Sequence, residues 1–422
     1  MRGGRVVISS SDQMPLLIGS SPARKPDGID DPLEANLVVL RDADGAPVLL
    51  GQIDTLFVDA RTCSEIARRV GVEESRLVLI ASHTHSAPAL TADVGHEGDL
   101  SEEHWHETIA RIAAGFQRLL AQDSTPAAVA MAQSSPGFNV SRRKRGWFLD
   151  TPALKSGRLR LRRSVELQPN PAGIVDPALR VLTLRNEAGH CLAVIWGYAA
   201  HPSRYPRRSR VSADFPGVVR RRLREELGGD LPVLYLPGFA GSTAPAVPWT
   251  LPSTPGQMVR ALVPLLPYSP SFTDMTFRRW SGKLADAAVA LAKEASPQHA
   301  LAVSLNAVRS RPIMRCADQG RDVMLDIRVL RLGSRLSLLA LSGEMLAEWM
   351  PLLGDPISRG VWPTGYLAGR PTYVPPRHVI EEGGYEAEGF KTYFKLQGAF
   401  AEDIDRVVTE AIRAACPASG KG

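Results

Sequence analysis

Three apolar runs in this chain end directly in turns that carry histidine or glutamate, and this repeated arrangement limits the folds that the chain can adopt. The runs are 77–80, 191–199 and 336–341, and the turns after them carry His83 with His85, His201, and Glu344, respectively. Short apolar runs bounded by turns are typical of buried strands. Strand ends of one sheet gather at one edge and form a cleft there. The three polar turns are therefore expected to meet at one site.

Strand and helix patterns alternate along the rest of the chain and predict an α/β fold. Further strands are expected at 36–42, 47–54, 179–184, 232–236, 301–308 and 323–331. Helices are expected at about 60–70, from Ser101 to about Leu119, from an N-cap at Asp214 to Gly228, at 275–295 and at 401–415. We expect a mixed β-sheet core flanked by helices. The site residues span 83 to 385, which predicts a single domain over residues 1–422.

Two segments do not fit this alternation. Residues 140–165 are rich in arginine and are predicted to be irregular. Residues 245–272 are rich in proline, which predicts an ordered insertion that could act as a lid. His104 and His106 lie in the first turn of the helix that follows Ser101 and are predicted to be surface residues.

The composition is that of an ordinary globular protein, with 422 residues, 44% hydrophobic and 22% charged. No apolar run is long enough to cross a bilayer, and the N-terminus has no apolar segment of the kind that signal peptides carry. The four cysteines are scattered without a Cys-x-x-Cys pair, which argues against a disulfide framework or a thiolate zinc site. These features predict a cytoplasmic protein without stable membrane insertion.

The net charge of +6 comes largely from arginine runs in different predicted elements. Basic clusters raise the question of nucleic-acid binding. No nucleic-acid motif accompanies them, so we expect no nucleic-acid partner. An anionic small-molecule substrate or a solvated surface accounts for the charge better. The sequence leaves open whether the chain forms a homo-oligomer.

The residue types at the three turns are those of a catalytic zinc site. Two imidazoles, a carboxylate and one further ligand form a common set of zinc ligands. Each turn alone is weak evidence, because a histidine after a strand can simply cap the turn and Glu344 can simply be a carboxylate in a first helical turn. Their recurrence at three strand ends predicts a bound Zn²⁺ ion.

The same turns carry motifs that resemble those of the neutral (alkaline, non-lysosomal) ceramidases. Ser82-His-Thr-His-Ser-Ala-Pro88 is similar to the zinc motif of that family, Ser-His-Thr-His-Ser-Gly-Pro. The further matches, in the family's order, are Tyr198-Ala-Ala-His-Pro-Ser203, Val211-Ser-Ala-Asp-Phe-Pro-Gly217, 237–245, Ser342-Gly-Glu344, Tyr373-Val-Pro-Pro376 and Gly383-Gly-Tyr-Glu386. The resemblance covers most of the chain and implies a divergent bacterial member with the fold of the family's catalytic domain.

The resemblance also implies a role for each matching residue. The implied zinc ligands are His83, His201, Glu344 and Tyr373. His85 would face the substrate, Arg142 or Arg143 would approach its head group, and Tyr385 would present a hydroxyl to it. Such groups could stabilise an oxyanion and move a proton. Without the resemblance, the two tyrosines would be interpreted as packing aromatics.

One loop departs from the family pattern. The ceramidases carry a functional serine just before the proline of a Gly-Asp-x-x-Pro loop, and this chain has Ala244 there and Ser242 in place of the aspartate. The role of the missing hydroxyl is lost or passes to Ser242 or Thr243. Asp54, at the end of the strand 47–54, is a further candidate for substrate contact. The sequence also shows neither the C-terminal β-sandwich domain nor the secretion signal of typical ceramidases.

These departures predict a substrate other than ceramide. The sequence indicates a cytosolic zinc amidohydrolase that cleaves the amide (N-acyl) bond of a small, anionic metabolite or natural-product intermediate. Three alternatives stay open. One is a lyase, cyclisation or amide-forming reaction on the same zinc scaffold. The second is hydrolysis of ceramide or another N-acyl lipid, and the third is a binding protein without catalysis.

Overall fold

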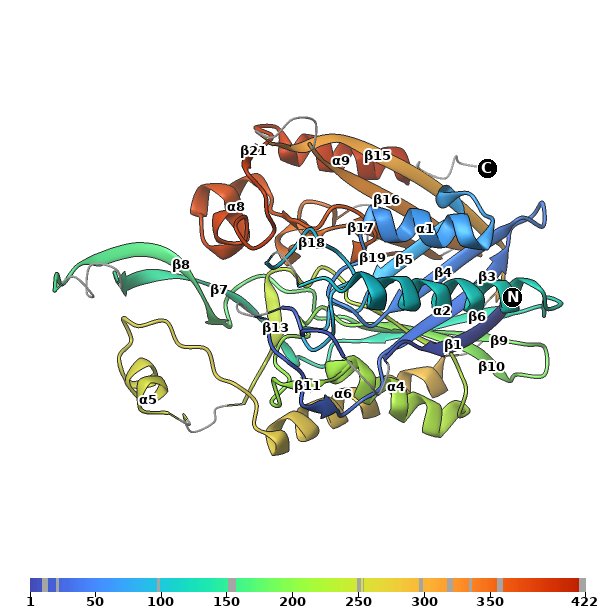
Figure 1. The fold of residues 1–422 in the computed structure, drawn as a ribbon, viewed down its shortest axis with the longest axis horizontal. Helices are drawn as coiled ribbons and strands as arrows, with labels where there is room; N and C mark the ends of the chain where they lie inside the picture. The colour runs from blue at the N-terminus through green and yellow to red at the C-terminus, as the bar shows by residue number, and fades with distance from the viewer. Residues whose placement is uncertain are drawn as a thin grey trace.

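Two β-sheets pack face to face at the centre of the structure, and helices cover their outer faces (Figure 1). This computed structural model describes all residues except 10–13, 20–22, 97–98, 151–156, 249–251, 253, 296–298, 317–321, 334–335, 355–359 and 417–422. The alternation of strands and helices along the chain therefore does produce an α/β architecture, as the sequence predicts.

The larger sheet has nine strands among the described residues. In spatial order they are β1 (Arg2–Val7), β3 (Glu34–Arg41), β4 (Pro47–Ile53), β5 (Leu77–Ala81), β19 (Val361–Leu367), β17 (Leu336–Ser342), β16 (Val323–Leu332), β15 (Val303–Cys316) and β21 (Gly398–Phe400). The pairs β4·β5 and β17·β19 are parallel and the other pairs are antiparallel. The prediction of a mixed sheet is confirmed.

Three strands of the smaller sheet, β9 (Leu179–Arg185), β10 (Cys191–Gly197) and β12 (Val233–Leu236), are largely buried. Its order is β12, β10, β9, β6 (Ala128–Ser134) and β14 (His299–Ala300). Ala193 and Ile195 of β10 belong to the core shared with the larger sheet, whereas Val194 and Trp196 belong to a second core with α4 (Asp214–Leu227) and α6 (Asp274–Glu294). Successive side chains of a strand point to opposite faces, so a strand buried on both faces is apolar at nearly every position.

The helices that cover the larger sheet agree with the predicted ranges. They are α1 (Ala60–Val70) and α2 (Glu102–Leu120), which pack on each other and on β5, β3 and β1, and α9 (Ile404–Ala415), which packs on β15 and β16. The Ser101 side chain caps α2 as expected. The prediction that His104 is a surface residue is wrong, because the apolar face of α2 buries it. Among the described residues, no helix combines the length and the apolar character that crossing a bilayer requires.

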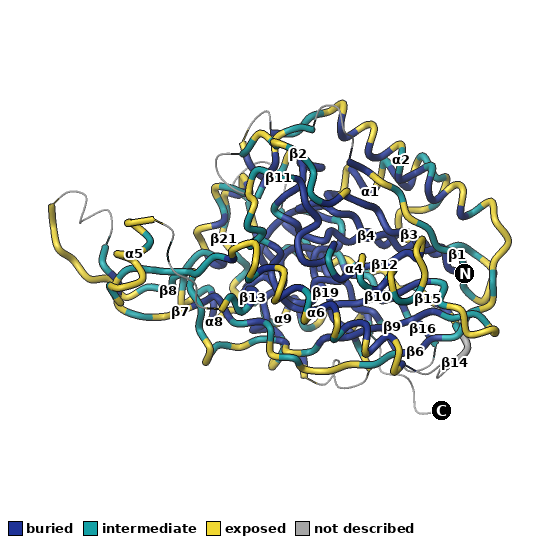
Figure 2. Tube along the Cα trace, turned by 90° about the horizontal axis from the view of Figure 1, so that it is seen from below, coloured by how far each residue is buried: buried dark blue, intermediate teal, exposed yellow. Residues whose placement is uncertain are grey.

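A hairpin of β7 (Asn139–Leu149) and β8 (Leu161–Asn170) projects from the body of the molecule beside α5 (Pro255–Leu262) (Figure 1). The prediction that residues 140–165 are irregular is therefore wrong for 140–149 and 161–165. Residues 150 and 157–160 lie in neither a helix nor a strand, and 151–156 lie outside the described residues. Arginines along both strands hide the alternation of apolar residues that identifies a strand. The outer part of this arm is largely exposed, whereas its base enters the buried body (Figure 2).

The sequence predicts that the three polar turns come from one sheet, and this prediction is wrong. The strands β5 and β17, which precede His83 and Glu344, belong to the larger sheet, whereas β10, which precedes His201, belongs to the smaller one. The two short strands β18 (Glu344–Met345) and β20 (Tyr373–Val374) pair beside them. Smaller elements are β2 (Gly28–Ile29), β11 (Arg210–Val211), β13 (Thr243–Pro245), α8 (Arg377–Glu382), η1 (Glu74–Arg76), η2 (Ala347–Trp349) and a π-helical turn η3 (Tyr385–Gly389). The site thus forms between the sheets.

Asp214 is the first residue of α4 and not its N-cap, which is Ala213. Its carboxyl group is buried, and its Oδ2 atom has no hydrogen-bond partner in the described part of the chain. Burial raises the pKa of Asp214 from 3.8 to about 7. In the unfolded chain this carboxyl group loses its proton near pH 4, whereas the folded protein retains it up to about pH 7. Stability is therefore expected to fall as the pH rises through this window.

The substitution Asp214→Asn is expected to remove most of this pH dependence, because an amide does not titrate. Between pH 4.5 and 7.5 the free energy of unfolding of the unmodified protein should fall by roughly 3 kcal/mol more than that of the variant. Urea denaturation at the two pH values measures the difference. Asp286→Asn, at an exposed position of α6, is the control and should retain the full pH dependence. An unchanged profile in Asp214→Asn would contradict the assignment.

Candidate metal centre

Three histidine side chains converge at one point in the buried part of the molecule. The Nε2 atom of His201 lies 3.1 Å from Nε2 of His83 and 3.0 Å from Nε2 of His85, and the latter two atoms are 3.4 Å apart. These three residues form the one group among the described residues with the spacing of metal ligands. Two nitrogens at about 2.0 Å from a tetrahedral ion lie about 3.3 Å from each other. The cluster therefore has the dimensions of one face of a tetrahedral site.

Backbone carbonyl groups fix the orientation of all three rings. The Nδ1 atoms of His83, His85 and His201 lie 2.9, 2.8 and 3.3 Å from the carbonyl oxygens of Leu56, Gly19 and Ala240, respectively. A carbonyl oxygen can only accept, so each Nδ1 must carry the hydrogen and donate it. In the neutral ring this leaves the lone pair on Nε2, where the three rings meet. Such hydrogen bonds to the outer nitrogen are typical of metal-binding histidines.

Local backbone geometry makes room for these contacts. Gly19 has a φ of 97°, and a Cβ atom on it would lie 2.6 Å from the ring of His85. Any other residue at this position would displace that ring. His83 has a φ of 63°, which is uncommon for a residue with a side chain and concentrates at functional sites. This conformation turns the chain directly after β5.

Burial keeps the cluster in its metal-binding form. Burial, followed by the neighbouring His83, holds the pKa of His85 well below 6.5. Burial and the positive charge of Arg142 do the same for the pKa of His201. Both rings are therefore neutral at neutral pH, and the neutral ring is the form that binds a metal ion.

Glu344 lies beside the histidines and supplies a carboxylate to the cluster. Its Oε2 atom is 3.4 Å from Nε2 of His83 and 3.8 Å from Nδ1 of His201. Gly343, with a φ of 79°, allows this approach, since a Cβ atom there would lie 2.9 Å from the carbonyl oxygen of Thr372. The hydroxyl of Tyr366 donates to the same Oε2 atom over 3.4 Å, and its ring lies against that of His83. Tyr366 was missed in the sequence, where no motif singles it out.

Tyr373 is brought to the site by its strand pairing. It lies opposite Glu344 in the pair β18·β20 and is buried. Arg142 donates a hydrogen bond of 2.8 Å to its hydroxyl. Burial raises the pKa of Tyr373 well above 10, and Arg142 opposes this shift. The structure thus places the fourth implied ligand next to the third, held by an arginine.

Arg142 and Arg143 share one buried carboxylate. Glu386 accepts a hydrogen bond of 3.0 Å from Nε of Arg142 and one of 2.8 Å from Nη1 of Arg143. A shift in the pairing register of β7 between Ser141 and Arg143 allows both neighbouring arginines to enter the interior. Burial alone would lower the pKa of Arg142, but its interactions with Tyr373 and Glu386 outweigh this effect and raise the pKa. Glu386 was also missed in the sequence analysis, although it adjoins the predicted Tyr385.

Three residues predicted to contact substrate have their polar groups engaged by the protein. Ser242 donates to the buried Glu348 and accepts from the amide of Ala347. Thr243 donates to the carbonyl oxygen of Ala199 over 2.8 Å. The carboxylate of Asp54 accepts from Arg220 over 2.7 Å and from two neighbouring donors, Gln52 and the amide of Glu34. These hydrogen bonds place Asp54 in the ion-pair cluster under α4 and not with the histidines.

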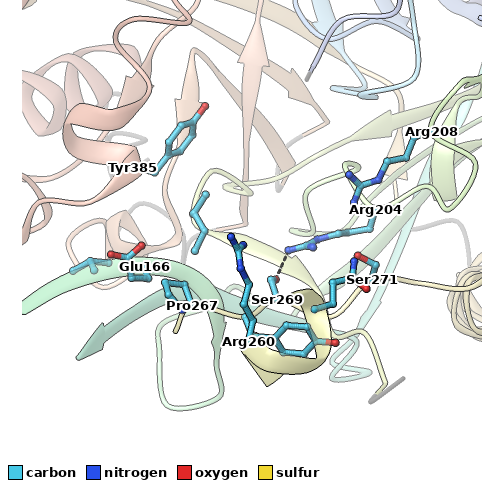
Figure 3. Close-up of a pocket in the computed structure, with 12 residues that line it drawn as sticks. Glu166, Arg204, Arg208, Arg260, Pro267, Ser269, Ser271 and Tyr385 are labelled. Atoms are coloured by element: carbon cyan, nitrogen blue, oxygen red, sulfur yellow. Dashed lines mark hydrogen bonds between the residues drawn. The ribbon is translucent and has the colours of Figure 1, made fainter. Parts of the chain in front are cut away.

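A cavity of about 430 Å³ lies next to this centre (Figure 3). Tyr385 lines it, and the ring of Tyr385 is 5.7 Å from that of Tyr373. Burial and the charge of Glu344 raise the pKa of Tyr385 to about 12, so its hydroxyl keeps its proton at neutral pH. It also begins the π-helical turn η3, a feature common at functional sites. The volume is within the usual range for small-molecule sites.

Two solved structures share this fold. Neutral ceramidase from Pseudomonas aeruginosa matches 98% of this chain and 74% of its own with a TM-score of 0.68 at 15% sequence identity. A ceramidase complexed with C2 matches 97% of this chain and 73% of its own, also with a TM-score of 0.68, at 14% identity. No family model and no curated protein matches the sequence. The predicted neutral-ceramidase-like fold is confirmed, in a strongly divergent chain.

Proposed function

We propose that this protein is a zinc-dependent hydrolase that cleaves the amide bond of a small N-acyl compound. The observation that carries the proposal is the convergence of three Nε2 atoms within 3.4 Å of one another. Glu344 stands beside them in a ceramidase-like fold. Imidazole and carboxylate are typical zinc ligands, and a catalytic zinc site keeps one position open for water or substrate.

The ligand set itself combines the resemblance with the geometry. His83 and His201 would hold the ion through Nε2, and Glu344 would hold it through its carboxylate. The resemblance assigns His85 to the substrate side, but the distances give its Nε2 atom the same reach as the other two. When bound, zinc would supply a Lewis acid that polarises a carbonyl group and lowers the pKa of water.

The surrounding residues would position the substrate. Arg142 fixes the hydroxyl of Tyr373 and carries a positive charge that would stabilise an oxyanion formed on the amide carbonyl. The hydroxyl of Tyr385 remains protonated at neutral pH and could donate a hydrogen bond to the same oxygen.

Two features support a substrate other than ceramide. Ala244, at the position of the family serine, is buried in β13 and has no hydroxyl to offer. Neither of the hydroxyls on the preceding residues replaces it, since Ser242 and Thr243 are bonded within the protein. The cavity beside the centre is lined with several arginines, which does not suit the hydrocarbon chains of a sphingolipid.

A chelation experiment with a panel of N-acyl compounds tests the proposal. Removing metal with a chelator is expected to abolish hydrolysis, and one equivalent of Zn²⁺ is expected to restore it. Release of the amine from short N-acyl amino acids should exceed release of sphingosine from a long-chain ceramide by about 100-fold or more, a difference of about 3 kcal/mol in barrier. Full activity in the metal-free protein would contradict zinc dependence. Turnover confined to amide formation or elimination would indicate a different reaction on this scaffold.

A further inference from the structure

The cavity beside the metal centre carries an excess of positive charge. Arg204, Arg208 and Arg260 line it, together with a single carboxylate, Glu166. That carboxylate is already paired with Arg162 over 2.6 Å and accepts from the hydroxyl of Ser164 over 2.7 Å. The three arginines therefore face the cavity without a counter-charge from its own lining.

Arg204 is held in place by neutral groups alone. It donates to the hydroxyl of Ser269 over 2.6 Å and to the carbonyl oxygen of Pro270 over 3.2 Å (Figure 3). In the described part of the chain, no carboxylate lies within 4.0 Å of its guanidinium group or of those of Arg208 and Arg260. Burial and repulsion by Arg142 lower the pKa of Arg204 to about 10. A guanidinium group that is held in position without a neighbouring carboxylate can bind a negatively charged ligand.

The cavity adjoins the metal centre through two residues. Arg204 follows the histidine of the second motif, His201, by three positions. On the opposite side, Tyr385 lines the cavity and contacts Tyr373 ring to ring. A small molecule in the cavity can therefore extend toward the three histidines.

The proline-rich insertion forms one wall of this cavity. The residues of the insertion that line the cavity are Gln257, Arg260, Pro267, Tyr268, Ser269 and Ser271. The helix α5, which carries Arg260, begins at a side-chain cap from Thr254 and lies beside the arm formed by β7 and β8 (Figure 1). In Figure 3, Arg260 lies across the cavity from Arg204 and Arg208. The segment predicted as a lid thus supplies a charged side chain to the cavity.

We propose that Arg204, Arg208 and Arg260 bind an anionic group of the substrate, a carboxylate or a phosphate, while the amide to be cleaved lies at the histidines. This inference rests on the proposed function for the identity of the reacting bond, but the anion site itself does not depend on it. Guanidinium groups bind carboxylate and phosphate through paired hydrogen bonds. The substrate class is therefore N-acyl compounds with a negative charge separate from the amide, such as N-acyl amino acids or N-acylated phosphoamines.

Calorimetric titration of the zinc-loaded full chain with three probes tests the anion site at low ionic strength, where charge interactions are least screened. Succinate and inorganic phosphate are expected to bind, and neutral succinamide is expected to bind at least about tenfold more weakly. The tighter of the two anions identifies the chemical source of the charge. Equal affinity for succinate and succinamide, or no binding of either anion, would overturn the inference.

Two variants locate the binding. Arg260→Gln changes an exposed residue of α5 and is not expected to affect folding, and Arg204→Gln changes the partly buried one. Each should weaken binding of the anion by about tenfold or more. Arg413→Gln removes an equal charge from an exposed position on α9 and should leave binding unchanged. Affinities that do not differ among the three variants would place the anion elsewhere and overturn the inference.

The two proposals can fail separately. The variant His83→Ala removes a proposed zinc ligand and should retain anion binding, because the arginines are intact. Anion binding without hydrolysis of any N-acyl compound would support the anion site and contradict the proposed function. Hydrolysis of neutral N-acyl amides with no preference for anionic ones would support the proposed function and contradict the anion site.

Discussion

Replacing His83 with alanine is expected to lower kcat/KM for amide hydrolysis by roughly 10³-fold and to remove bound zinc. His83 contributes Nε2 to the cluster at 3.1 and 3.4 Å from the other two imidazoles, and the same atom lies 3.4 Å from the carboxylate of Glu344. A catalytic metal ion supplies several kcal/mol of transition-state stabilisation, which corresponds to a factor of this size. Steady-state kinetics and metal analysis of the purified variant measure both effects.

His190→Ala is the matched control, because His190 lies exposed in the turn between β9 and β10. It should retain both zinc and activity. The circular dichroism spectrum of His83→Ala should remain that of the folded protein, since the ring makes a single hydrogen bond to the backbone of the described residues, at Leu56. Activity of His83→Ala within tenfold of the unmodified protein would show that the cluster is not the catalytic centre.

Replacing Glu386 with alanine is expected to lower the free energy of unfolding by about 3–5 kcal/mol. Its carboxylate is fully buried and pairs with both Arg142 and Arg143, which are themselves almost fully buried. Arg143 would keep Glu382 at 3.2 Å, whereas Arg142 has no second carboxylate within 4.0 Å among the described residues. Removing one partner of a buried ion pair leaves uncompensated charge in the interior, and this is the costly case. Urea denaturation measures the change. Activity should also fall, because Arg142 fixes the hydroxyl of Tyr373.

Glu381→Ala provides the comparison for this variant. Glu381 forms an ion pair of 2.8 Å with Arg377, but both side chains are about half exposed. Such pairs contribute at most about 1 kcal/mol. If the two glutamate variants lost similar stability, the buried ion pairs of Glu386 would contribute no more to stability than an exposed ion pair, which would contradict the prediction.

The elements of the fold were readable from the sequence because their signals are local. The run that ends at Ala81 and the helix capped by Ser101 depend on neighbours a few residues away. The division into two sheets was not readable, since β5 and β10 have the same apolar pattern and differ only in distant pairing partners. The hairpin that carries Arg142 was missed, because its four consecutive basic residues form a buried pair and then an exposed pair, and no alternation of apolar and polar residues marks the strand.

The centre of the site was predicted better than its surroundings. His83, His201 and Glu344 lie together, and Tyr373 pairs with Glu344, because each residue follows a strand or belongs to one. That these four residues bind zinc stays a prediction. The Nε2 atom of His85 points into the cluster as that of His83 does, because the carbonyl group of Gly19, far away in the chain, orients the ring of His85. Tyr366 and Glu386 carry no local signal, since a buried hydroxyl or carboxylate is explained only by partners that the fold brings to it.

We propose that the three converging imidazoles and Glu344 hold a zinc ion. Anomalous diffraction at the zinc absorption edge, from crystals of the protein purified without added metal, tests it most directly. We predict a single strong peak at about 2.0–2.1 Å from Nε2 of His83 and of His201 and within bonding distance of Glu344. No peak at this point, or a peak at another position in the chain, would contradict it.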